Sequence, residues 1–213
     1  MATPPPRWIT DTAPGHSEWY IDRFRTMASA GDDLAGEARL LDAMVPRRSR
    51  ILDAGCGPGR LGAHLHAAGH EVVGVDVDPK LIAAAEQDHP GPTWLVGDLA
   101  ELDLADPHGP ARTATGEQAP ALDEKFDAIV CAGNVMVFVA PDTEARVLRR
   151  LAAHLKDDAP LVVGFHTDRH LTLDAFDAAA DQAGLRLDLR LATWDLRPWT
   201  PESDWAVSIL RRT

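Results

Sequence analysis

The chain is poor in cysteine, in basic residues and in long apolar runs. Its 213 residues include two cysteines, Cys56 and Cys131, whose spacing fits neither a metal site nor a disulfide framework. We therefore expect two buried, reduced thiols in a cytoplasmic protein. No apolar run is long enough to cross a bilayer and no signal-peptide pattern begins the chain, so we expect neither a membrane span nor a secretory leader.

Basic side chains are outnumbered: 33 Asp and Glu residues face 21 Lys and Arg residues, a net charge of −12. Nucleic acids are bound largely through Lys and Arg that neutralise phosphates, so this balance argues against a nucleic-acid partner. It argues less strongly against an anionic membrane surface. The length suffices for one domain with a sizeable core.

The most informative stretch covers residues 51–60. Two apolar residues lead into Asp53, and glycines then occupy every second position, at Gly55, Gly57 and Gly59. From residue 61 the apolar spacing becomes helical, which predicts a strand, a tight turn and a helix. Glycine permits positive φ and close approach of a ligand, while the free N–H groups of the helix start face that ligand. Residues 57–62 also fit the dinucleotide pattern G-x-G-x-x-G, so the turn alone does not identify the ligand.

Apolar strands alternate with helical segments along the rest of the chain. The first predicted strand ends at Asp53. The other predicted strands cover residues 72–76, 93–96, 126–131, 161–165, 185–191 and 205–209. No helix separates the last two strands, so they are predicted to pair antiparallel. The pattern predicts an α/β, Rossmann-like, doubly wound seven-stranded sheet, mostly parallel, with an antiparallel C-terminal hairpin and helices on both faces.

Two segments stand apart from this alternation. Residues 1–46 are predicted to form a Pro-rich arm and two helices, the first N-capped by Ser17 and the second ended by Pro46. We expect this segment to act as a lid on a single compact unit formed by residues 47–213. Residues 103–124 have almost no large apolar side chain, which predicts an exposed, mobile loop.

Three acids, Asp53, Asp76 and Asp98, each follow a predicted strand. In an open parallel sheet the ligand lies at the carboxyl ends of the strands, so the three should converge on one crevice. Asp76 lies 21 positions after Gly55, a spacing that suits a carboxylate accepting hydrogen bonds from ribose hydroxyls. A lone Asp here is more often a helix cap, but three in register with a glycine turn point to a ligand site.

Together these motifs resemble class I S-adenosylmethionine-dependent methyltransferases. The resemblance rests on Asp53-x-Gly55-x-Gly57-x-Gly59, Asp76, Gly97-Asp98-Leu99, the strand at 126–130 and the final hairpin, which is similar to that family's reversed seventh strand. It covers residues 17–213. Residues 132–136 and 194–199 look like an actinobacterial branch that acts on small molecules.

The resemblance implies S-adenosylmethionine as the cofactor, S-adenosylhomocysteine as its product, and no metal. The implied cofactor-binding residues are Asp53, Ala54, Gly55, Cys56, Gly57 and Gly59 around the methionine part, Asp76 and Val77 at the ribose and adenine, Asp98 and Leu99 at the adenine, Ala132 and Gly133 at the methionine tail, and Tyr20 and Arg23 from the lid. Core packing explains Tyr20 equally well, and a solvated face explains Arg23.

The acceptor side is less defined. Candidate acceptor-pocket residues are Trp19, Asn134, Met136 and Trp194, and His166 and His170 are candidate bases if the acceptor must lose a proton. Ordinary packing or solvent exposure is the simpler explanation for each. The stretch 133–136 lacks the Asn-Pro-Pro-Tyr or Asp-Pro-Pro-Tyr motif of nucleic-acid and protein amide methyltransferases, and with the acidic net charge this favours a small-molecule substrate. We separately expect a monomer or homodimer.

Two alternatives stay open from the residues alone. One is an NAD(P)-dependent oxidoreductase using residues 57–62. Against it stand Asp98, the antiparallel ending and the absence of a Tyr-x-x-x-Lys pair, since the single tyrosine, Tyr20, precedes the sheet. The other is a non-catalytic cofactor-binding protein of the same fold, because fold does not fix function.

Overall fold

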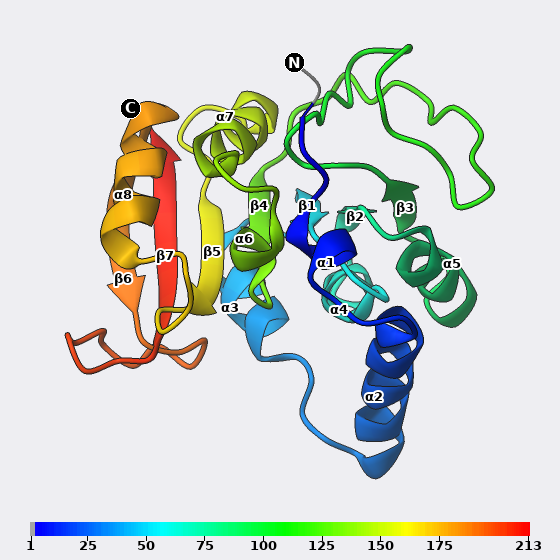
Figure 1. Ribbon diagram of the computed structural model, residues 1–213, viewed down its shortest axis with the longest axis horizontal. Helices are drawn as coiled ribbons and strands as arrows, with labels where there is room; N and C mark the ends of the chain where they lie inside the picture. The colour runs from blue at the N-terminus through cyan, green and yellow to red at the C-terminus, as the bar shows by residue number, and fades with distance from the viewer. Residues whose placement is uncertain (1–2) are drawn as a thin grey trace.

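A seven-stranded sheet forms the centre of the protein, whose computed structural model describes residues 3–213 (Figure 1). The first two residues of the predicted arm lie outside the described range. The strands are β1 (Arg50–Ala54), β2 (Glu71–Asp76), β3 (Thr93–Val96), β4 (Ala128–Cys131), β5 (Leu161–His166), β6 (Leu185–Leu191) and β7 (Trp205–Arg212). They are ordered β3-β2-β1-β4-β5-β7-β6, and only β7 runs antiparallel to its neighbours. The predicted fold class is confirmed.

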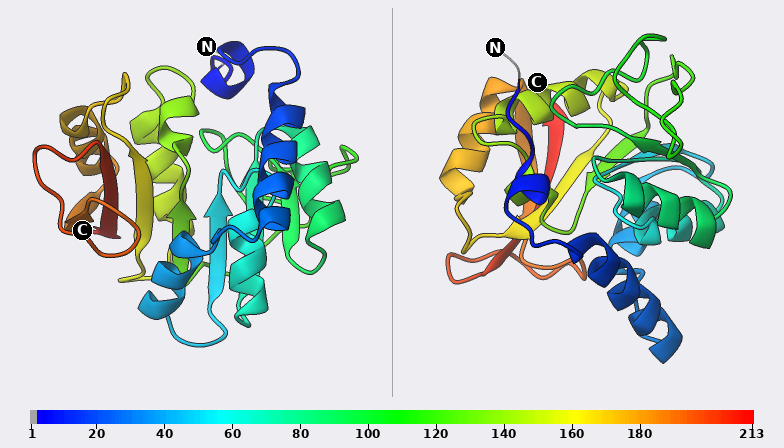
Figure 2. Two further views of the ribbon diagram at one scale, coloured as in Figure 1. Left: turned by 90° about the horizontal axis from the view of Figure 1, so that it is seen from below. Right: turned by 45° about the vertical axis from the view of Figure 1, so that its right-hand side comes forward.

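Helices cover both faces of the sheet (Figures 1 and 2). They are α1 (Arg7–Thr10), α2 (His16–Ala30), α3 (Gly36–Met44), α4 (Arg60–Ala67), α5 (Pro79–Asp88), α6 (Val135–Phe138), α7 (Glu144–His154) and α8 (Leu173–Gln182). Successive strand residues face opposite sides, so Ile51 packs with α3 and α4 whereas Leu52 packs with the core formed by α7 and α8. This double burial explains why the parallel strands are apolar throughout.

The N-terminal segment divides between two places. α3 belongs to the layer covering the sheet, because its Leu41 is buried in the same cluster as Ile51. α1 and α2 instead lie near the carboxyl ends of the strands, and α2 packs against α5 (Figure 2). The N-cap position of α2 is Gly15, so the predicted cap at Ser17 is wrong; the Ser17 hydroxyl donates a hydrogen bond to Asp78 instead.

Residues 103–124 form a long connection whose backbone extends the sheet edge locally. The Val96 N–H donates to the Arg112 carbonyl at 2.7 Å and the reverse bond measures 2.9 Å. Ala111 and Ala119 are buried in the main core. Leu104 of the same segment is buried there too, so the prediction of an exposed loop was wrong for these positions, because a few widely spaced apolar residues are enough to pack the segment on the core.

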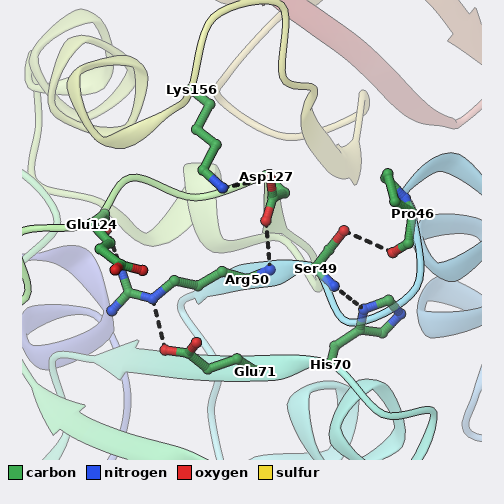
Figure 3. A network of polar contacts seen from close by, with 8 residues as sticks. All are labelled: Pro46, Ser49, Arg50, His70, Glu71, Glu124, Asp127 and Lys156. Atoms are coloured by element: carbon green, nitrogen blue, oxygen red, sulfur yellow. Dashed lines mark hydrogen bonds and ion pairs between the residues drawn. The ribbon is translucent and has the colours of Figure 1, made fainter.

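A polar network joins strands and loops at the amino end of β1, on the side opposite to the carboxyl ends (Figure 3). The Arg50 guanidinium pairs with Glu71 at 2.7 Å and donates to the Glu124 carbonyl. The Arg50 N–H donates to Asp127, which also accepts from Lys156 at 2.7 Å. The network fixes β1 relative to β2 and to the chain entering β4, so the residues after β1 leave from a rigid strand.

Candidate functional site

A pocket of about 850 Å³, open to solvent, lies at the carboxyl ends of β1, β2, β3 and β4. Eleven of the fourteen predicted cofactor-binding residues line it: Tyr20, Asp53, Gly55, Cys56, Gly57, Asp76, Val77, Asp98, Leu99, Ala132 and Gly133. The β-α-β order explains the convergence, because parallel strands bring their carboxyl ends, and the loops that follow them, to the same edge of the sheet.

Asp53, at the end of β1, is 2% exposed. Its Oδ2 accepts a hydrogen bond of 3.0 Å from the Gly62 N–H in the first turn of α4. Burial raises the pKa of Asp53 to about 7, and the neighbouring carboxylate of Asp76 adds to this rise. A carboxylate that is costly to ionise in the empty pocket gains from a cationic ligand group, which would restore its charge.

Asp76 ends β2, and backbone N–H groups hold both of its carboxylate oxygens. Oδ2 accepts from Gly57 at 2.9 Å, and Oδ1 accepts from Asp78 at 3.0 Å. Burial raises the pKa of Asp76 to about 6. The carboxylate is thus fixed between the glycine turn and the start of α5, with remaining lone pairs available to hydroxyl donors in the pocket.

Two features of the backbone at position 55 require a glycine. Its φ is +78°, and a Cβ there would lie 2.3 Å from Cγ2 of Val135 at the start of α6. The glycine turn and α6 therefore approach each other closely below the pocket.

On the adenine side that the motifs imply, Asp98 accepts from the Ala100 N–H at 2.9 Å, and burial raises the pKa of this carboxyl group.

An aromatic cluster from the N-terminal segment covers the pocket, and the sequence analysis named only Tyr20 of its members. Trp8 packs edge-on against Tyr20 and Phe138, with ring centroids 5.4 and 5.6 Å away. Tyr20 packs in turn against Phe24 at 4.9 Å. Burial raises the pKa of Tyr20, so its hydroxyl stays protonated. The proline-rich context of Trp8 had suggested only an arm.

Arg60 is a pocket-lining cation that the sequence analysis also missed. Its guanidinium makes two hydrogen bonds to Glu37, at 2.7 and 2.9 Å, and both side chains are less than one-fifth exposed. The same guanidinium lies 5.2 Å from the Phe24 ring centroid. Through these contacts Arg60 of α4 links α3 and α2. Because Glu37 neutralises its charge, Arg60 gives the pocket little net positive charge.

Three predicted cofactor-binding residues lie outside the lining. Ala54 is fully buried in the core beneath the sheet edge. Gly59 faces away, since a Cβ there would lie 2.9 Å from Ala85 and 3.0 Å from Trp94. Arg23 is exposed, with its guanidinium 5.7 Å from the Trp19 ring.

The predicted acceptor-pocket residues do not line the pocket. Trp19 is 54% exposed on α2, and Met136 is fully buried because α6 presents it to the core. Trp194 packs on Gly164 of β5, where a Cβ would lie 2.4 Å from its ring. Asn134 has a structural role, because its Oδ1 accepts from the His166 N–H at 2.7 Å.

The two candidate bases also lie elsewhere. The His166 ring packs edge-on against Trp205 at 4.5 Å, with Nδ1 3.2 Å from the Asp204 carbonyl oxygen. His170 lines a separate shallow pocket together with Arg7 and Gln182. Cys56 and Cys131 are both buried and unpaired, as predicted, and burial raises the pKa of each thiol.

A mostly parallel sheet ending in a reversed seventh strand, with a glycine turn and acids at the ends of β1 and β2, defines the class I methyltransferase fold, whose cofactor is S-adenosylmethionine. A model of the methyltransferase domain family matches residues 52–161, more than half of the chain. The chain belongs to this family.

A solved relative extends the match over the whole fold. The chain is 40% identical to a TehB-like SAM-dependent methyltransferase from Corynebacterium glutamicum, covering 94% of this chain and 100% of that chain with a TM-score of 0.82.

Curated relatives match a smaller part. A malonyl-[acyl-carrier protein] O-methyltransferase from Pectobacterium atrosepticum is 35% identical over 94 residues, which cover 43% of this chain and 35% of the relative. A magnesium-protoporphyrin O-methyltransferase from Rhodobacter capsulatus is 33% identical over 107 residues, covering 48% and 39%. The chain thus spans little more than a third of the length of these curated relatives.

Proposed function

We propose that the protein transfers the methyl group of S-adenosylmethionine to a small-molecule acceptor. The observation that carries this proposal is the convergence of Asp53, Asp76 and Asp98 with the glycine turn on one pocket. In this proposal Asp53 faces the ammonium of the cofactor, Asp76 accepts from the ribose hydroxyls, and Asp98 accepts from the adenine amino group. Family membership favours this activity over the oxidoreductase alternative.

When bound, the cofactor supplies an electrophilic methyl group, whose carbon–sulfur bond breaks as the bond to the acceptor forms, with the electron pair staying on sulfur. The protein contributes orientation and shielding from water. No histidine lines the pocket within residues 3–213. His166 and His170 therefore have no catalytic part in this proposal.

The relatives and the charge of the chain support the proposed class of acceptor. The curated relatives named above are O-methyltransferases, but their matches cover less than half of this chain. The Corynebacterium relative supports the actinobacterial small-molecule branch.

The net charge of −12 supports a partner other than nucleic acid, and no described helix has the length and apolarity of a membrane span. Two unpaired buried thiols support a cytoplasmic location. We propose a monomer or homodimer.

We also propose that residues 1–46 contain the lid, with α1 and α2 as its closing part. The support is that Trp8, Tyr20 and Phe24 line the pocket. Deleting residues 1–30 should weaken cofactor binding and leave the sheet folded, as followed by circular dichroism. Unchanged affinity in the truncated protein would remove the lid from the proposal.

A thermal-shift titration with S-adenosylmethionine, S-adenosylhomocysteine, NAD and NADP tests the proposed function. Ligand at about 100 times its dissociation constant stabilises the folded state by roughly 2.7 kcal/mol, a rise of about 5 to 10 °C for this size. The two adenosyl ligands should give this rise and Asp76→Ala should lose it. Glu202→Gln, an exposed carboxylate in a turn, should keep it. A rise with NAD alone would refute the proposal.

A further inference from the structure

One end of the pocket is apolar, and of the residues named for it below only Tyr20 is among the implied cofactor contacts. Pro6 and Trp8 reach it from the N-terminal segment, and Phe138 and Val139 reach it from α6 and the residue after it. α1 packs against α6 here (Figure 1), and the Trp8 and Phe138 ring centroids lie 5.6 Å apart. Trp8, Tyr20 and Phe138 are called the aromatic roof below.

One buried carboxylate holds this roof in place. Asp78 is 5% exposed, and its Oδ2 accepts from Trp8 Nε1 at 3.0 Å and from the Ser17 hydroxyl. Its Oδ1 accepts from the Lys80 N–H at 2.9 Å and caps α5. Trp8 is half-buried, and the bond from its N–H to a carboxylate favours one orientation of the indole ring. The same carboxylate ties the start of α2 to α5.

The roof is also connected to the candidate cofactor site. The Asp78 N–H donates to Asp76, the carboxylate proposed to bind the ribose. Asp78 therefore contacts both the roof and the candidate cofactor site from the turn between β2 and α5. The side chain fixes the roof, and the backbone fixes the carboxylate below it.

Charge defines what this end of the pocket accepts. The charged residues of the lining are Asp53, Asp76, Asp98 and Arg60. The three acids end strands, and Glu37 neutralises Arg60 through two hydrogen bonds. Beside the roof lie the Asp78 carboxylate, bonded to Trp8, and the His16 ring, 4.9 Å from the Trp8 ring, while the lining cation Arg60 is paired with Glu37. An anionic acceptor group would therefore lose its hydration there without gaining an unpaired arginine or lysine. A flat apolar group would pack on the rings instead.

We propose that Trp8 determines acceptor specificity by contacting a neutral, aromatic or apolar acceptor, and that Asp78 is the positioning residue that holds Trp8. This inference rests on the proposed function and names the substrate class for the same site. It explains why a tryptophan from the N-terminal arm is hydrogen-bonded to a residue 70 positions away.

Fluorine NMR on the full chain labelled with 5-fluorotryptophan tests this inference. The protein is saturated with S-adenosylhomocysteine and titrated with indole, a neutral aromatic probe, or with indole-3-acetate, its anionic counterpart. Trp8→Phe assigns the Trp8 resonance. Indole should shift that resonance saturably, and indole-3-acetate should bind at least about tenfold more weakly, because its charge gains no partner.

The variants distinguish a loss of the Trp8 position from a general loss of folded structure. Asp78→Asn keeps an oxygen to cap α5 and should weaken indole binding about tenfold, since the Trp8 N–H loses its charged acceptor. Ser17→Ala should weaken it less, and Ser29→Ala, at the exposed end of the same helix, should leave it unchanged. S-adenosylhomocysteine affinity is measured for each variant, and indole affinities are compared at saturating S-adenosylhomocysteine, because Asp78 also holds the helix proposed to cover the cofactor.

Two results would overturn the inference. One is an indole shift at other tryptophans but not at Trp8, and the other is wild-type indole affinity in both Asp78→Asn and Ser17→Ala. Failure of the wild-type protein to bind S-adenosylhomocysteine would refute the proposed function itself, and this inference with it.

Discussion

Replacing Asp53 with asparagine should stabilise the empty protein at alkaline pH while weakening its cofactor binding. In the folded protein burial raises the pKa of Asp53 to about 7, against an ordinary value of 3.8. Between these two values the folded state holds a proton that the unfolded state has released, so the stability of the wild-type protein falls as pH rises from about 4 to about 7 and then stays level. Asparagine keeps an oxygen for the Gly62 N–H and carries no charge.

The magnitude follows from the linkage between pKa and stability. At pH 5.5 the folded carboxyl group is about 1.5 pH units below its pKa, and each unit corresponds to 1.36 kcal/mol. Between pH 5.5 and 8.5 the wild-type protein should therefore lose about 2 kcal/mol that Asp53→Asn does not lose. For a chain of this size, this is a relative melting-temperature change of roughly 4 to 8 °C.

Urea unfolding at the two pH values, followed by circular dichroism, measures this difference. Glu202→Gln serves as the exposed control and should follow the wild-type protein at both values. Parallel pH dependence in Asp53→Asn and the wild-type protein would refute the argument that burial raises the Asp53 pKa. A lower free energy of unfolding at pH 8.5 for Asp53→Asn than for the wild-type protein would refute the argument as well.

Three further changes test other parts of the site. Gly55→Ala should cost about 2 kcal/mol or more in urea unfolding, because its Cβ meets Val135, and adding Val135→Ala should recover part of the loss; full stability of the single variant would contradict the contact. Arg60→Met should cost about 1 to 3 kcal/mol by leaving the half-buried Glu37 unpaired, and Arg60→Met with Glu37→Leu should recover most of it. His166→Ala should keep S-adenosylhomocysteine affinity within about twofold by calorimetry; a tenfold loss would return this residue to the site.

The sequence predicts local features of the fold well. β3 and β6 have the predicted bounds, Thr93–Val96 and Leu185–Leu191, because a buried apolar run and a strict alternation are each set within a few residues. The three strand-end acids meet for a similar reason, since parallel order alone brings them to one edge.

Long-range contacts account for what the sequence did not predict. The hydrogen bond from Trp8 to Asp78 joins residues that no local pattern connects. Met136 was expected at the acceptor because it follows β4, but the orientation of α6 presents it to the core. Ala111 is buried in a segment that composition alone assigns to solvent, since small residues suffice where the chain packs closely.

A crystal structure of the full chain with S-adenosylhomocysteine tests the central claim most directly. The proposed function predicts the ligand between the glycine turn and α2, with both ribose hydroxyls donating to Asp76 and the adenine amino group donating to Asp98. The sulfur should face the end of the pocket roofed by Trp8 and Phe138. Density for the ligand at another place, or an Asp76 carboxylate that does not contact the ribose, would contradict the claim.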